Sequence, residues 1–156
     1  MPISGRSARR CGIRSASRRS SISDLLFLLD THVFIRWTDE PHRLSKDQIR
    51  VLDRAVASGG RLAVSSITLI EIATLFGRGS RRSSLSAEKI LGIIESADVL
   101  DILPISLRIA REVAVMGDSL KDPADRVIVA TARIQGLRLV TSHQRIVESG
   151  LVPVVE

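Results

Sequence analysis

Aromatic side chains are scarce in this sequence, which has no tyrosine, one tryptophan and three phenylalanines among its 156 residues. A protein that reads bases on the face of a sheet needs several exposed aromatic rings on which the bases stack. So few rings argue against a sheet of that kind, and the function has to be sought in other side chains.

Cysteine is almost absent as well, since Cys11 is the only one. A single cysteine excludes an intramolecular disulfide and any metal site built from several thiolates. No apolar run approaches the roughly 18 residues that a membrane-spanning helix requires. The first residues also lack the apolar core of a secretory signal. These absences fit a protein of a reducing, cytoplasmic setting.

Acidic residues are missing from residues 1–23, a segment rich in Arg, Ser and Gly whose six arginines account for the whole net charge of +6. Acidic and basic residues balance in the remainder, so its net charge does not indicate nucleic-acid binding. We expect 1–23 to be a disordered tail and 24–156 to be one folded domain. An Arg- and Ser-rich start without acids is also typical of an organelle transit peptide.

Apolar runs alternate with amphipathic segments along the rest of the chain. The amphipathic segments begin at a Ser or Asp cap and end at Gly, as helices do. The expected strands are 25–30, 61–66, 99–105, 137–142 and 151–155, and the expected helical segments, caps included, are 45–60, 66–77, 86–97, 106–117 and 122–136. This alternation predicts an α/β fold in which helices flank a parallel sheet.

Acidic side chains are expected to gather at one edge of this sheet, because sites in open α/β sheets lie beyond the carboxyl ends of the strands. Asp30 ends the first strand, and Glu71 lies one and a half turns into the helix after the second. Asp122 and Asp125 open the helix that precedes the fourth strand.

Acids that converge repel one another and should raise one another's pKa, a conflict that a divalent cation removes. Oxygen ligands without cysteine favour Mg²⁺ or Mn²⁺. A site of this kind suits phosphodiester hydrolysis, since the metal polarises the phosphoryl oxygen and activates a bound water.

Each acid also has an ordinary structural interpretation. Asp30 and Asp122 are both placed to cap a helix. Asp125 could pair with the dipole of its helix. Glu71 could be a solvated helix position, although its neighbours are apolar almost all round.

Four motifs follow one another along the chain: LLDTHVFIRW, VSSITLIEIA, DPADRVIVATA and LVTSHQRI. In this order and spacing they resemble PIN-domain ribonucleases, above all the VapC-type toxins of toxin–antitoxin pairs, over about residues 24–156. The resemblance implies a three-layer α/β/α sandwich with a five-stranded parallel sheet and Mg²⁺- or Mn²⁺-dependent cleavage of RNA. It also implies homodimers and inhibition by a cognate VapB-type antitoxin.

Carried over residue by residue, the resemblance assigns catalysis and metal binding to Asp30, Glu71 and Asp125. Asp122 matches an additional acid of the relatives that share Asp-Pro-x-Asp, and we expect it to cap its helix while Asp125 faces the metal. The hydroxyls of Thr31 and Thr141 are expected to support the carboxylates.

His143 departs from the family, because many relatives carry an acid at this position. Imidazole binds Mn²⁺ but suits Mg²⁺ poorly, so the site is expected to favour Mn²⁺, to use one metal, or to be impaired. A surface histidine without a role is a further alternative. An impaired chain would be a PIN scaffold that binds RNA or an antitoxin without cleavage.

His32 and His42 are expected to be bystanders. A phosphatase of the HAD type is set aside, because that chemistry needs an Asp where His32 stands. A basic loop with Arg78, Arg81 and Arg82 follows the helix of Glu71. It is a candidate for holding RNA phosphates or an acidic antitoxin segment, although runs of charge usually face water.

Overall fold

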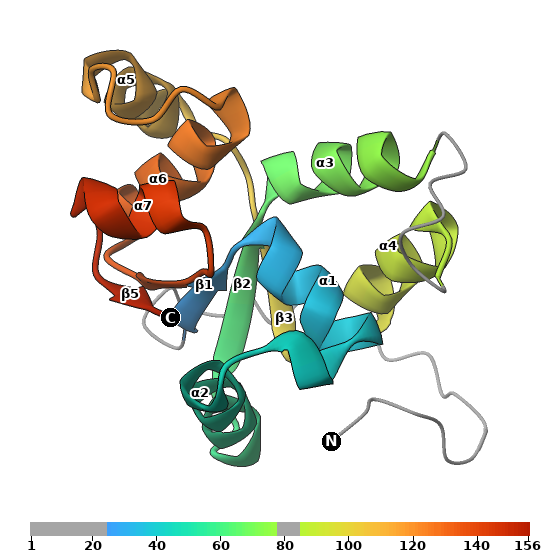
Figure 1. Ribbon diagram of the computed structural model, residues 1–156. Coiled ribbons are helices and arrows are strands. Elements are labelled where there is room, and N and C mark those ends of the chain that lie inside the picture. Colours follow the sequence, from blue (N-terminus) through green and yellow to red (C-terminus); the bar gives the residue numbers. More distant parts are fainter. Residues whose placement is uncertain (1–24, 78–84) are drawn as a thin grey trace, which may run out of the picture.

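The computed structural model describes residues 25–77 and 85–156, so the tail expected at 1–23 and the basic loop of Arg78, Arg81 and Arg82 lie outside the described residues. Five strands form one sheet (Figure 1): β1 (Leu25–Leu29), β2 (Arg61–Ser65), β3 (Leu100–Leu103), β4 (Arg138–Val140) and β5 (Val154–Val155). Their order is β3-β2-β1-β4-β5, and every neighbouring pair is parallel. The predicted parallel five-stranded sheet is confirmed.

Side chains that alternate along the strands supply a separate core on each face of the sheet. Leu28 and Leu139 belong to one core, and Leu29 and Val140 belong to the other; all four are fully buried. The first face is covered by α5 (Leu107–Val115), α6 (Pro123–Gln135) and α7 (Gln144–Ser149), and the second by α1 (Thr31–Asp39), α2 (Lys46–Ala57) and α4 (Ala87–Ser96). The predicted three-layer α/β/α arrangement is therefore confirmed.

The remaining helix, α3 (Ser66–Phe76), starts directly after β2 and contacts both cores. Ile67 packs against the first core and Ile72 is buried in the second. None of the helices within 25–77 and 85–156 is long and apolar enough to cross a membrane.

Two short elements, α7 and the 3-10 helix η2 (Pro41–Arg43), are not predicted by the sequence pattern, and α1 is indicated only by the interpretation of Asp30 as a helix cap. In α1 the run Val33, Phe34 and Ile35 consists of β-branched and aromatic residues, which favour strands. In α7 there are six residues, too few to show a helical period. An amino-terminal cap nevertheless stabilises α1 as a helix, because the Asp30 side chain accepts a hydrogen bond from the His32 N–H.

Helix starts and strand ends meet at one edge of the sheet. α1 and α3 begin where β1 and β2 end, and α6 begins at the same edge because a crossover helix runs antiparallel to the strands. α6 then ends at Gly136, whose φ of 66° places it in the left-handed conformation that favours glycine. This edge is where the predicted site acids lie.

Candidate functional site

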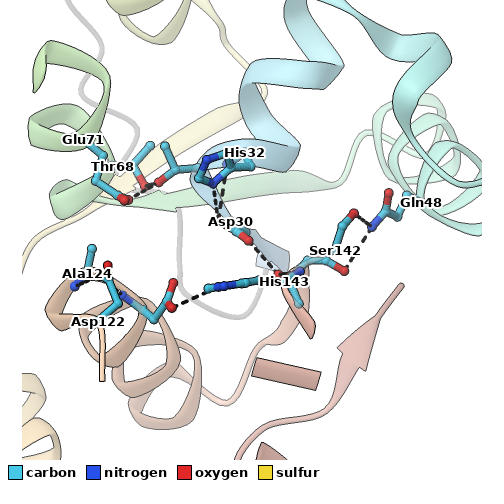
Figure 2. Close-up of polar contacts among 12 residues, drawn as sticks. Asp30, His32, Gln48, Thr68, Glu71, Asp122, Ala124, Ser142 and His143 are labelled. Atoms are coloured by element: carbon cyan, nitrogen blue, oxygen red, sulfur yellow. Dashed lines mark hydrogen bonds and ion pairs between the residues drawn. The ribbon is translucent and has the colours of Figure 1, made fainter. Parts of the chain in front are cut away.

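One cavity of about 270 Å³ at the carboxyl edge of the sheet is lined by all four predicted acids, Asp30, Glu71, Asp122 and Asp125. The side chains come from the end of β1, from α3 and from the start of α6, and His143 joins them from the loop after β4 (Figure 2). Segments far apart in the chain therefore contribute to one acidic site.

Asp30 is the most buried acid of the site, with 3% of its surface exposed. Its carboxylate accepts hydrogen bonds from the Thr141 hydroxyl at 2.6 Å and from the His32 N–H at 3.3 Å, and the His32 ring nitrogen Nδ1 lies 3.9 Å away. Burial alone would raise the pKa of Asp30, but these contacts outweigh it and hold the pKa below its usual value. Asp30 is thus an ionised carboxylate that also caps α1.

Glu71 is half-buried and is held by a threonine. The Thr31 hydroxyl donates a 2.5 Å hydrogen bond to Oε2 of Glu71, and the Thr68 hydroxyl oxygen lies 3.0 Å from that of Thr31. Burial is the main cause that raises the pKa of Glu71, with a smaller contribution from the charge of Asp30, while the Thr31 hydrogen bond opposes them. A purely solvated helix position does not describe Glu71.

Asp125 faces the cavity beside His143. The ring nitrogen Nδ1 of His143 lies 3.0 Å from Oδ2 of Asp125. Burial raises the pKa of Asp125, His143 counteracts this, and the charges of Asp122 and Asp30 raise it further. Asp122 accepts hydrogen bonds from the N–H groups of Ala124 and Asp125 at 2.8 and 3.4 Å, so its predicted role as the cap of α6 is confirmed.

The pKa values of the site acids therefore do not all shift in the same direction. The expectation that the acids raise one another's pKa agrees with Glu71 and Asp125, although burial is the larger cause. It is wrong for Asp30, where burial raises the pKa but the contacts of the His32 ring and the Thr141 hydroxyl lower it by more.

The position of His32 also differs from the expectation, whereas that of His42 agrees with it. His32 was expected to be a bystander, yet it lines the cavity and contacts Asp30. His42 lies in η2, is exposed and does not line the cavity. Arg36 and Ser142 line it as well; both lie within the quoted motifs, but neither is among the site residues expected from the sequence.

Gln48 is a further residue that sequence reasoning missed. Its side chain is 1% exposed, and Nε2 donates hydrogen bonds to the Thr141 carbonyl at 3.1 Å and to the Ser142 hydroxyl at 2.9 Å. Its Oε1 accepts from the Ser45 N–H, which completes the capping box of α2. The capping box was visible in the sequence, whereas the tether from α2 to the loop of Thr141 and His143 was not.

The donor set of the cavity fits a divalent cation in its chemistry. Carboxylate oxygens suit Mg²⁺ and Mn²⁺, and an imidazole nitrogen suits Mn²⁺ better than Mg²⁺. Within residues 25–77 and 85–156, however, no three His, Cys, Asp or Glu side chains are grouped closely enough to hold one ion. One oxygen of Glu71 is bound by Thr31, and one oxygen of Asp125 lies 3.0 Å from His143.

Comparisons with known proteins agree with this architecture. Residues 27–148 match the family model of the PIN domain. Ribonuclease VapC22 of Mycobacterium tuberculosis (strain ATCC 25618 / H37Rv) is 33% identical over 120 residues, which cover 76% of this chain and 88% of that protein.

Solved structures with the same fold have lower identities. A chain of VapBC2 from Rickettsia felis, bound to a DNA fragment from its promoter, superposes with a TM-score of 0.63 at 17% identity and covers 83% of this chain and 97% of its own. A chain of DNA-bound VapBC from Salmonella typhimurium has a TM-score of 0.60 at 22% identity. The match covers 84% of the present chain and 97% of the Salmonella chain.

Opposite effects on stability are expected for two neutralising substitutions in the metal-free protein. Asp30 has a lowered folded pKa, so its charge stabilises the fold above its unfolded pKa and that contribution is lost as pH falls through the folded value. Asp30→Asn should therefore lower the free energy of unfolding at pH 7.5 by about 1.5–3 kcal/mol, the range for hydrogen bonds to charged groups. Glu71 has a raised folded pKa, so its ionisation costs stability as pH rises.

Glu71→Gln should accordingly unfold at the same or a higher denaturant concentration than the unsubstituted protein at pH 7.5. The measurement is urea denaturation with EDTA at pH 7.5 and again in steps down to pH 2.5, below the unfolded pKa of an aspartate, where the deficit of Asp30→Asn should shrink. A more stable Asp30→Asn together with a less stable Glu71→Gln would contradict these pKa directions.

Removal of the Gln48 tether should loosen the loop after β4. Gln48→Leu leaves the Thr141 carbonyl and the Ser142 hydroxyl without their buried donor, which typically costs about 1–3 kcal/mol. Hydrogen exchange should become faster at residues 141–147. Ser45→Ala, which weakens the same capping box but leaves the tether, is the matched control and should not change exchange in that segment. Equal exchange in the two variants would mean that Gln48 acts only through the cap.

Proposed function

The chain belongs to the PIN-domain family, and we propose that it is a metal-dependent endoribonuclease that acts as the toxin of a type II toxin–antitoxin system. The observation that carries the proposal is the single cavity lined by Asp30, Glu71, Asp122 and Asp125. Similarity to Ribonuclease VapC22 supports RNA as the substrate, because that relative covers three quarters of this chain.

The metal of the proposed enzyme is Mg²⁺ or Mn²⁺. Asp30, Glu71 and Asp125 would hold it, with Asp122 and His143 as further candidates at the same cavity. When bound, such an ion polarises the scissile phosphate and lowers the pKa of the attacking water. The raised pKa of Glu71 and Asp125 in the metal-free protein means that protons compete with the ion for these two carboxylates.

The chain's own residues have defined tasks in this proposal. Burial raises the pKa of Asp30, but the His32 ring, the Thr141 hydroxyl and the His32 N–H together lower it by more, which favours the charged form of this ligand. Thr31 binds one oxygen of Glu71 and so holds this side chain at the cavity that it lines. Gln48 holds the backbone segment from which Thr141 and His143 project.

A VapB-type antitoxin and a second copy of the chain are the proposed protein partners. Support comes from the solved structures that share the fold, whose names describe VapBC complexes. Large apolar side chains on the surface offer contact area for such partners: Ile70 is 62% exposed, Leu107 67% and Val115 76%. Exposed apolar groups of this size are common at protein–protein interfaces.

A scaffold that binds RNA or the antitoxin without cleavage is the second candidate function. Two observations favour it: His143 stands against Asp125 at 3.0 Å, and no three ligating side chains among the described residues already converge on one point. The retention of Asp30, Glu71 and Asp125 in one cavity favours the enzyme.

Cleavage of single-stranded RNA distinguishes these two candidates. Mn²⁺ should support cleavage by the purified protein, and EDTA should abolish it. Asp125→Asn should lower the rate by at least about 100-fold, because loss of groups that merely orient metal ligands already costs about 10–100-fold. His42→Asn, prepared in the same way, is the control for contaminating nucleases and should cleave normally. Cleavage that persists in EDTA or in Asp125→Asn would remove the metal-dependent nuclease, and absence of cleavage would favour the scaffold.

Metal preference should depend on His143. Imidazole adds no negative charge and is a poor partner for Mg²⁺, so cleavage is expected to be faster with Mn²⁺ than with Mg²⁺. His143→Asp supplies a carboxylate and should raise the rate with Mg²⁺ relative to the rate with Mn²⁺. The measurement is the ratio of the two initial rates in each protein. An unchanged ratio would mean that His143 has no part in metal selection.

A further inference from the structure

A second cavity adjoins the acidic one. It has a volume of about 190 Å³ and lies between α1 and the carboxyl-terminal end of α3. His32 and Arg36 line both cavities, so the two lie on either side of these side chains. Ile35, Leu75 and Phe76 give the second cavity an apolar wall, in contrast to the carboxylates of the first.

We propose that this second cavity binds one nucleobase of the RNA strand, with Phe76 as its main apolar contact and Arg36 as the contact for the adjacent phosphate. The inference rests on the proposed function and adds to it a substrate subsite next to the scissile bond. Its small volume fits a single base, whereas a helix or strand of a partner protein would need a longer groove.

Charge supports RNA as the occupant. A cavity lined by four carboxylates repels a polyanion, so the strand needs cations beside it. Arg36 is the only Arg or Lys that lines the acidic cavity within the described residues, and no ion pair neutralises it there. Arg43, at the far side of the second cavity, already pairs with Glu40 at 2.8 Å. The free positive charge therefore lies at the junction of the two cavities, where a phosphate between two nucleotides would pass.

Packing supports Phe76 as the base contact. Its side chain is partly buried against the core of α1, α2 and α4, which fixes its position, while the remainder lines the cavity. The neighbouring Leu75 is 38% exposed and extends the apolar wall. Few aromatic rings occur in this chain, so no extended stacking platform exists, but one ring suffices for one base. Contacts between a base and an aromatic side chain change affinity by about 5- to 150-fold.

The test measures binding of a fluorescent single-stranded RNA by anisotropy in an Asp125→Asn background with Mn²⁺, so that the RNA stays intact. Phe76→Leu keeps an apolar side chain but removes the ring, and it should weaken binding by at least about 5-fold. Phe76→Tyr keeps the ring and should bind within about 2-fold of the parent. Unchanged thermal unfolding of both variants excludes a folding defect.

Salt dependence tests Arg36 separately. Arg36→Gln should reduce the slope of log K against log salt by about 0.7, the contribution of one phosphate contact on a single strand. Arg54→Gln, at an exposed position on α2 outside both cavities, is the control and should leave the slope unchanged. Equal affinities of Phe76→Leu and Phe76→Tyr, an unchanged slope in Arg36→Gln, or no RNA binding by the parent would overturn the subsite.

The two proposals fail in different ways. If the unsubstituted protein cleaves RNA but Phe76 and Arg36 do not affect binding, the subsite is wrong and the nuclease stands. If RNA binding depends on Phe76 and Arg36 while no metal supports cleavage, the subsite stands and the nuclease gives way to the scaffold.

Discussion

A charged carboxylate buried at the end of β1 is the constraint on which the rest of the site depends. Burial of an unpaired charge is costly, so Asp30 needs donors that are held in place. Leu29 and Val140 are paired neighbours in the register of β1 and β4, and Asp30 and Thr141 follow them directly. The sheet itself therefore brings the Thr141 hydroxyl to the Asp30 carboxylate, and the amino-terminal end of α1 adds the His32 N–H.

Two other acids of the site, Glu71 and Asp125, hold a proton more strongly than Asp30 does. Burial raises the pKa of both Glu71 and Asp125, whereas the pKa of Asp30 is lowered. Protons therefore compete with a cation more strongly at Glu71 and Asp125 than at Asp30. Thr31 donates a hydrogen bond to Glu71, and His143 lies 3.0 Å from Asp125, so each of these two carboxylates already has a polar partner at the cavity.

Much of this arrangement was predictable from the sequence, because capped helices and apolar strands have local signatures. The parallel sheet and the shared edge of Asp30, Glu71 and Asp125 follow from the alternation of strands and helices. Gln48 was not predictable as a tether, because its partners Thr141 and Ser142 lie more than ninety residues further along the chain and the contact depends on packing. His32 and Arg36 were missed for a related reason: they lie on α1, a helix whose β-branched and aromatic composition hides its helical character.

We propose that the acidic cavity binds a divalent cation through Asp30 and Asp125, and titration of Mn²⁺ followed by electron paramagnetic resonance tests this binding most directly. Bound Mn²⁺ loses the sharp signal of the free aqueous ion, so binding is counted without any RNA or cleavage. We expect binding by the unsubstituted protein and by Glu88→Gln, in which an exposed acid on α4 is neutralised. We expect at least about 10-fold weaker binding by Asp30→Asn and by Asp125→Asn. Mn²⁺ binding of equal strength in all four proteins, or in none of them, would contradict the proposal.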